Sequence, residues 1–105
     1  MSQIGTFQRI MIEAIQDPLV AGSVQAEIAE ALAADLRYGI WFYDQKGRGK
    51  AEVLDELLDE YETVTDACES AWEAYKRSHE TEQLKGLLRC LGDLRGVLVR
   101  QVATI

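Results

Sequence analysis

The chain has 105 residues and a formal net charge of −7, with a share of apolar and charged residues that is ordinary for a globular protein. This length fits one domain, and the acidic surplus disfavours a protein that coats nucleic acid and favours a protein partner with a basic surface. No apolar run reaches the ~20 residues that a membrane span requires, and the N-terminus lacks a signal-peptide pattern, so we expect a cytoplasmic protein that does not use a membrane.

The fold class follows from the spacing of apolar residues. A single proline and the absence of alternating Val/Thr-rich runs favour an all-α fold. Apolar residues at three- and four-residue steps predict helices at about 2–16, 23–44, 51–77 and 80–103. Paired with their neighbours, these helices form a four-helix bundle-like arrangement of two antiparallel hairpins in a single domain. The short hairpin spans 1–45, a loop spans 46–50 and the long hairpin spans 51–105.

The first two predicted helices carry matching apolar stripes. Asp17-Pro18 ends the first helix, and Ser23 is the expected N-cap of the second. In an antiparallel pair, each residue of the first stripe faces one of the second. The facing pairs are Ile15–Val24, Met11–Ile28, Phe7–Leu32 and Ile4–Leu36.

An aromatic block closes the second predicted helix and extends past the reach of the first. Residues 38–43 contain half of the eight aromatic side chains, and this block has no partner within its own hairpin. It either packs into the core against the second hairpin or anchors a partner protein or a second copy of the chain. The candidate binding residues are Tyr38, Trp41, Phe42 and Tyr43.

The loop that follows is the main basic cluster. Lys46, Arg48 and Lys50 alternate with glycines just before the third helix, whose free N–H groups and these cations can hold a phosphate. The Walker pattern does not fit, and a helix-turn-helix interpretation of 26–43 lacks a glycine-centred turn. The alternative to anion binding is a solvated connector.

The third predicted helix is the most unusual segment. Residues 51–75 contain nine acidic side chains and no basic one. With Leu54 at heptad position a, apolar residues occupy a, d and e, which is wide enough for a bundle core. Like-charged neighbours on the opposite face cost about 0.2–0.5 kcal/mol per pair, or on the order of 1–3 kcal/mol together. The seven carboxylates at positions b and f are Glu52, Asp55, Asp59, Glu62, Asp66, Glu69 and Glu73.

The fourth predicted helix mirrors the third across a tight turn near 77–80, with Ser78 as its expected N-cap. Facing residue numbers sum to 158 or 159, from Tyr75–Leu84 through Leu57–Val102 to Leu54–Ile105. Three glycines weaken this helix by up to about 1 kcal/mol each, so we expect close helix contact along their side. They are Gly86, Gly92 and Gly96.

No motif for catalysis or metal binding is present in the sequence. His79 is the single histidine, it falls at the predicted turn, and neither Cys-x-x-Cys nor His-Glu-x-x-His occurs. Cys68 and Cys90 lie equally far from that turn and can approach each other, and we expect both to be reduced. We therefore expect no catalytic residue, metal or cofactor.

The sequence favours a non-enzymatic acidic helical protein that binds a partner protein, of the inhibitor, antitoxin, immunity or chaperone-adaptor type. The acidic face would steer the encounter and the aromatic block would anchor it. One alternative is a nucleic-acid-associated regulator that contacts phosphate through Lys46–Lys50. Another is a nucleic-acid mimic formed by a dimer, because one helix carries about one charge per 4 Å against about one per 1.7 Å in DNA. A third is a self-associating structural component.

Overall fold

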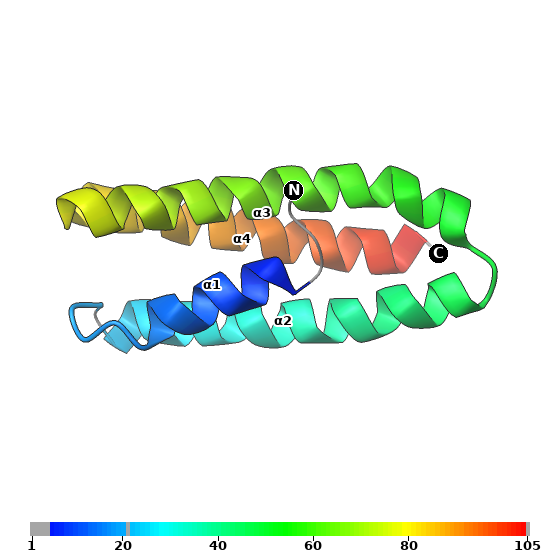
Figure 1. The fold of residues 1–105 in the computed structure, drawn as a ribbon, viewed down its shortest axis with the longest axis horizontal. Helices are drawn as coiled ribbons and strands as arrows, with labels where there is room; N and C mark the ends of the chain where they lie inside the picture. The colour runs from blue at the N-terminus through cyan, green and yellow to red at the C-terminus, as the bar shows by residue number, and fades with distance from the viewer. Residues whose placement is uncertain (1–4, 21, 105) are drawn as a thin grey trace.

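The computed structural model describes residues 5–20 and 22–104 and confirms the all-α fold, with no strand among these residues. The helices are α1 (Thr6–Ile15), α2 (Gly22–Gly47), α3 (Ala51–Ser78) and α4 (Thr81–Thr104). They form an elongated bundle of 44 × 20 × 19 Å, in which α1 is much shorter than the other three (Figure 1). Helix α2 runs beyond its predicted end, so Lys46 belongs to its last turn and the connection to α3 shrinks to Arg48–Lys50.

The two predicted antiparallel hairpins are present and pack against each other. Helix α4 packs on α3 and α2, whereas α1 packs on α2 and α3, and α2 also meets α3 across the middle of the bundle. In the described part of the chain, the backbones of α1 and α4 do not come close. The chain direction in Figure 1 shows that α2 and α4 run parallel, as do α1 and α3.

The turns form near the predicted places, but neither predicted N-cap residue lies directly before the first residue of its helix. Helix α2 already includes Gly22, so Ser23 lies inside it. Ser78 is the last residue of α3, and its hydroxyl accepts a hydrogen bond from the Glu80 N–H at 3.3 Å. The chain reverses through His79 in the left-handed conformation (φ 55°), whose N–H caps α3 by donating to the Tyr75 carbonyl.

The α3–α4 register agrees with the prediction, but Gln101 and not Val102 continues the buried stripe of α4. Gln101 Nε2 donates to the Leu57 carbonyl at 2.9 Å, so these two positions face each other as expected. Gln101 is fully buried, whereas Val102, the predicted partner of Leu57, is exposed. The regular steps of the buried stripe reach Gln101 three residues after Leu98, and there the Gln101 amide oxygen accepts a hydrogen bond from Tyr38 of α2. Ile105 lies outside the described residues.

Helix α2 shows a similar departure. Val24 and Ile28 are buried as predicted, but Leu32 is only half-buried and Leu36 is exposed. The buried line continues instead through Ala31, Asp35, Tyr38 and Phe42. It does so because this half of α2 faces α3 and α4 as well as α1. The predicted partner of Leu36, Ile4, lies outside the described residues.

The glycines of α4 do not serve close helix packing. A Cβ atom built at Gly86, Gly92 or Gly96 would meet no heavy atom within 4 Å. Gly92 and Gly96 are exposed on the outer side of the bundle. The expectation of close contact along this side is therefore wrong for the residues that the structure describes.

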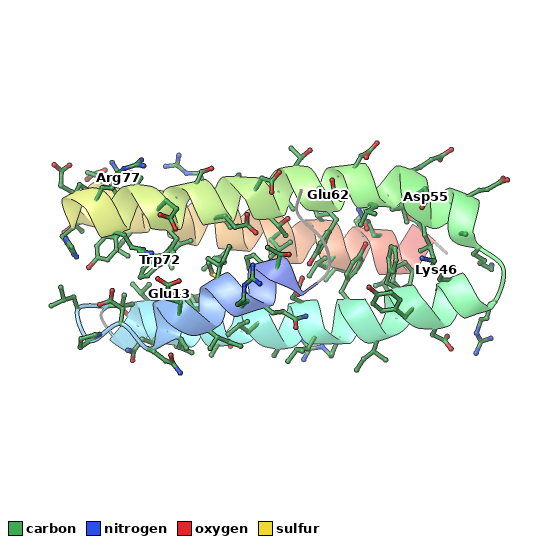
Figure 2. All side chains as sticks on the ribbon, viewed as in Figure 1. Glu13, Lys46, Asp55, Glu62, Trp72 and Arg77 are labelled. Atoms are coloured by element: carbon green, nitrogen blue, oxygen red, sulfur yellow. The ribbon has the colours of Figure 1, made fainter. Side chains whose placement is uncertain are left out.

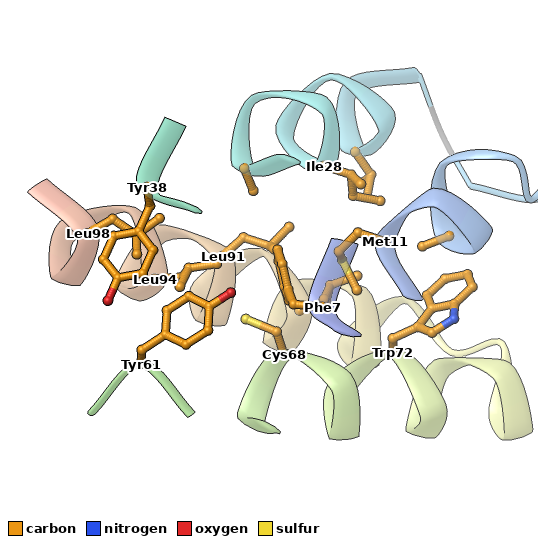
Figure 3. Close-up of a cluster of buried hydrophobic side chains, with 14 of the residues drawn as sticks. Phe7, Met11, Ile28, Tyr38, Tyr61, Cys68, Trp72, Leu91, Leu94 and Leu98 are labelled. Carbon is orange, nitrogen blue, oxygen red and sulfur yellow. The ribbon is translucent and has the colours of Figure 1, made fainter. Parts of the chain in front are cut away.

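The core changes character along the bundle. Beneath α1 it is apolar and includes Phe7, Met11, Ile28, Trp72 and Leu91 (Figure 3). Toward the other end, Tyr38 and Tyr61 approach each other from α2 and α3, with Leu98 of α4 beside Tyr38 (Figure 3). This second region contains the buried polar residues Asp35 and Gln101.

Candidate functional site

The acidic residues predicted for partner binding lie on one helix. Glu52, Asp55, Asp59, Asp66 and Glu73 are exposed on α3, as the heptad pattern predicts. Figure 2 shows oxygen-tipped side chains projecting from the edge of α3 that faces away from the other helices. We call the seven predicted carboxylates the acidic face.

The other two members of the acidic face, Glu62 and Glu69, are half-buried, and one carboxylate oxygen of Glu69 is shielded from solvent. Part of the predicted face therefore turns toward the protein, which narrows its solvent-exposed portion.

The exposed portion of the acidic face is poorly neutralised by the rest of the molecule. Glu73 makes an ion pair with Lys76 at 3.6 Å. Five other members make no ion pair with any residue that the structure describes, and four of these five, all but the half-buried Glu62, are exposed to solvent. They are Glu52, Asp55, Asp59, Glu62 and Asp66.

The aromatic block divides between core and surface. Tyr38 and Phe42 are buried, and the Tyr38 ring stacks on Tyr61 at a centroid distance of 4.9 Å. Trp41 is half-buried and Tyr43 is exposed. Within this chain Tyr38 and Phe42 are therefore core residues, and Trp41 and Tyr43 are the members of the block with solvent-exposed surface.

A buried polar network that the sequence pattern did not reveal connects α1, α2 and α3. Asp35 is fully buried, and its Oδ1 accepts a hydrogen bond from the Tyr61 hydroxyl at 2.6 Å. Its Oδ2 accepts from Gln8 Nε2 at 2.8 Å. Burial raises the pKa of the Asp35 carboxyl above its ordinary value, and the hydrogen bonds from Tyr61 and Gln8 oppose part of that rise.

A second set of hydrogen bonds joins α2 to α3 and α4, and it meets the first where the Tyr38 ring stacks on Tyr61. The Tyr38 hydroxyl donates to Gln101 Oε1 at 2.7 Å, and Gln101 Nε2 donates to Glu60 Oε1 at 3.0 Å. Arg100 completes the chain at the surface with a short ion pair to Glu60. The hydrogen bonds from Arg100 and then Gln101 hold the pKa of Glu60 below its ordinary value. Burial, followed by the negative charge of Asp35, raises the pKa of both Tyr38 and Tyr61, so each hydroxyl stays protonated and can donate.

The basic loop is exposed at one end of the bundle. Lys46, Arg48 and Lys50 are exposed, but Arg48 pairs with Asp44 at 3.0 Å and Glu52 lies in the first turn of α3. Two cations therefore remain for an anion, beside an acidic side chain. Phosphate binding at this loop stays a prediction.

The two thiols meet across the α3–α4 hairpin, as their equal distance from the turn predicts. Cys68 is buried and Cys90 is half-buried, and both are free thiols. Burial raises the pKa of the Cys68 thiol, and the neighbouring Cys90 adds to the rise. His79 is exposed and lies edge-on to the Tyr75 ring at 5.3 Å. Among the described residues, no cluster of three histidine, cysteine or acidic side chains could hold a metal ion.

None of the helices in the described part of the chain has the apolar length that a membrane crossing requires. No protein-family model matches the sequence, and comparisons with curated proteins and with solved structures gave no match.

Proposed function

We propose that this protein is a non-enzymatic binding module whose acidic face on α3 recognises a basic surface of a partner protein. An inhibitor, antitoxin, immunity protein or chaperone adaptor would work in this way. The observation that carries the proposal is the set of five carboxylates on α3 that make no ion pair with the described residues.

The spacing of the acidic face supports a partner that is itself extended. Glu52, Asp59, Asp66 and Glu73 repeat every seven residues, which is about 10 Å per repeat and roughly 30 Å in all. At physiological ionic strength, screening sets in over about 8 Å, so each carboxylate acts mainly on a cation close to it. Basic side chains of a partner at similar spacing would bind along this row.

The repulsion between neighbouring carboxylates of the acidic face also supports a binding role. Like charges three and four residues apart destabilise a helix by about 0.2–0.5 kcal/mol per pair, and cations of a bound partner would turn this repulsion into attraction. Basic residues interspersed on α3 would have kept the protein soluble without that cost. Charge complementarity of this kind also speeds association.

The test replaces three adjacent, unpaired members of the acidic face. In the variant Asp59→Asn, Glu62→Gln, Asp66→Asn, we expect the free energy of unfolding to rise by about 1 kcal/mol at low salt, because four like-charge pairs disappear. We expect binding of a basic partner to be lost. The wild-type protein and the variant would each serve as immobilised bait in a lysate of the source cells, with elution by a salt gradient and identification by mass spectrometry.

A matched control changes the net charge equally at another exposed place. The variant Glu80→Gln, Glu82→Gln, Asp93→Asn should retain the same basic protein as the wild type and release it at nearly the same salt concentration. Equal retention by the α3 variant, or no basic protein retained by any bait, would contradict the proposal.

A further inference from the structure

A groove of about 460 Å³ lies between α2 and α4, on a side of the bundle that the acidic face does not include. Tyr38 and Leu98 contribute buried side chains to its lining, and Trp41, Val99 and Val102 contribute more exposed ones. Because the groove joins two helices from different hairpins, the sequence pattern of a single hairpin could not reveal it.

Part of the groove lining is apolar and exposed to solvent. Val99 is 72% exposed and projects from the helix that forms one wall. Trp41 is half-buried, so its indole is available to a bound molecule. Exposed apolar side chains that line a groove mark a surface that another molecule can cover.

The charged side chains at the groove are arginines. Arg37 is exposed and makes no ion pair with any described residue. Arg95 makes ion pairs with Glu30 at 2.9 Å and with Glu27 at 3.6 Å. Of the two arginines that line the groove, Arg37 is therefore the one available to pair with a partner. Charge complementarity therefore favours a negatively charged occupant, which distinguishes this surface from the acidic face of α3.

The shape of the groove favours a helix as the occupant. Helices α2 and α4 run parallel along it (Figure 1), and a third helix can lie between them and bury one stripe against both. The lining spans residues 34–41 of α2 and 95–103 of α4, or about two helical turns. The lining includes Ala34 and Ala103, whose small side chains leave room for the backbone of a bound helix to approach α2 and α4.

We propose that the α2–α4 groove binds an amphipathic helix of a partner protein whose apolar stripe is flanked by acidic residues. Apolar side chains at positions i, i+3 or i+4, and i+7 would cover Trp41 and Val99, and a neighbouring carboxylate would pair with Arg37. This surface is independent of the acidic face. The protein would then have two binding surfaces of opposite charge preference.

The test uses two synthetic helical peptides that share one leucine stripe and differ only in flanking glutamates or lysines. Binding would be followed by two-dimensional NMR, using the Trp41 indole N–H and the Val99 amide as groove signals. We expect the acidic peptide to shift these signals and to bind the groove at least about tenfold more tightly than the basic peptide. The Asp59→Asn, Glu62→Gln, Asp66→Asn variant should bind the acidic peptide at least as well, which separates this proposal from the function of α3.

Two exposed substitutions locate the site without disturbing the core. Arg37→Glu should reverse the preference between the peptides, and Val99→Ser should weaken acidic-peptide binding by about tenfold. The matched control is Leu36→Ser, an exposed apolar residue of α2 that does not line the groove. The proposal is overturned by absent groove shifts with the acidic peptide, by equal groove binding of both peptides, or by an equal loss in Leu36→Ser. A concentration-dependent dimer abolished by Val99→Ser would also overturn it, because the occupant would then be a second copy.

Discussion

The two halves of the bundle core use different kinds of interaction. Beneath α1, residues such as Phe7, Met11 and Leu87 form an apolar region from which water is excluded. Toward the other end of the bundle, the core depends on hydrogen bonds from Tyr61 to Asp35 and from Tyr38 to Gln101, and Gln8 at the start of α1 also donates to Asp35. Apolar contacts are strong but not directional, whereas a buried hydrogen bond forms only when both groups face each other. We infer that the apolar half provides most of the stability and that the polar half fixes the rotation of each helix.

The largest effect is expected from breaking the apolar half. Leu87 is fully buried, so Leu87→Ala should reduce the free energy of unfolding by about 2–5 kcal/mol through lost burial and the cavity that remains. Urea denaturation would measure the change. Val99→Ala, at an exposed position of the same helix, is the control and should stay within about 0.5 kcal/mol of the wild type. Similar losses in both variants would refute the assignment of Leu87 to the core.

An intermediate effect is expected from one bond of the polar half. Tyr61→Phe keeps the stacking on Tyr38 but removes a donor from the buried Asp35 carboxylate, which should cost about 1–3 kcal/mol. Tyr43→Phe removes the hydroxyl of an exposed tyrosine and should change little. Denaturation of both variants under the same conditions tests the comparison, and it fails if they are equally stable.

The smallest effect is a dependence of the polar half on pH. Because burial raises the pKa of Asp35 in the folded protein, folding favours its protonated form. Its contribution to stability is therefore fully present below the pKa of the unfolded chain and is lost as pH rises through the folded pKa. In Asp35→Asn this contribution is absent, and Gln8 can turn its amide to accept from the new Asn N–H.

The measurement is the difference in unfolding free energy between the wild type and Asp35→Asn, followed over a pH series. The wild type should lose stability relative to the variant as pH rises, and the effects of carboxylates common to both proteins cancel. A difference that stays constant with pH would show that Asp35 does not titrate differently on folding.

The helices and both hairpins could be predicted because each stripe of apolar residues repeats within its own segment. The same repetition predicts the carboxylates of the acidic face on the outside of α3, where five of the seven are exposed. The apolar pattern fails where a polar residue occupies a core position. It predicts Leu36 where Asp35 is buried and Val102 where Gln101 is buried. Steps of three and four residues from Ile28 to Phe42 pass through Asp35, and this regular spacing is the sequence signal that indicates a buried position there.

The way in which one hairpin packs on the other could not be predicted from the sequence pattern. It determines that Tyr38 and Phe42 are buried while Trp41 stays partly exposed, because α4 lies against α2. The same packing creates the α2–α4 groove. The periodicity of apolar residues within one helix does not indicate which helix of the other hairpin it will pack against.

The short turn between α3 and α4 has a consequence for how the protein folds. Two residues join these helices, so their contacts nearest the turn form between residues close in the chain and need little loop closure. The bonds of the polar network join residues much farther apart, 63 positions in the case of Tyr38 and Gln101. We therefore expect the α3–α4 hairpin to assemble early and the polar network to form last, when the hairpins dock. Mutations in that network would then accelerate unfolding and leave the folding rate nearly unchanged.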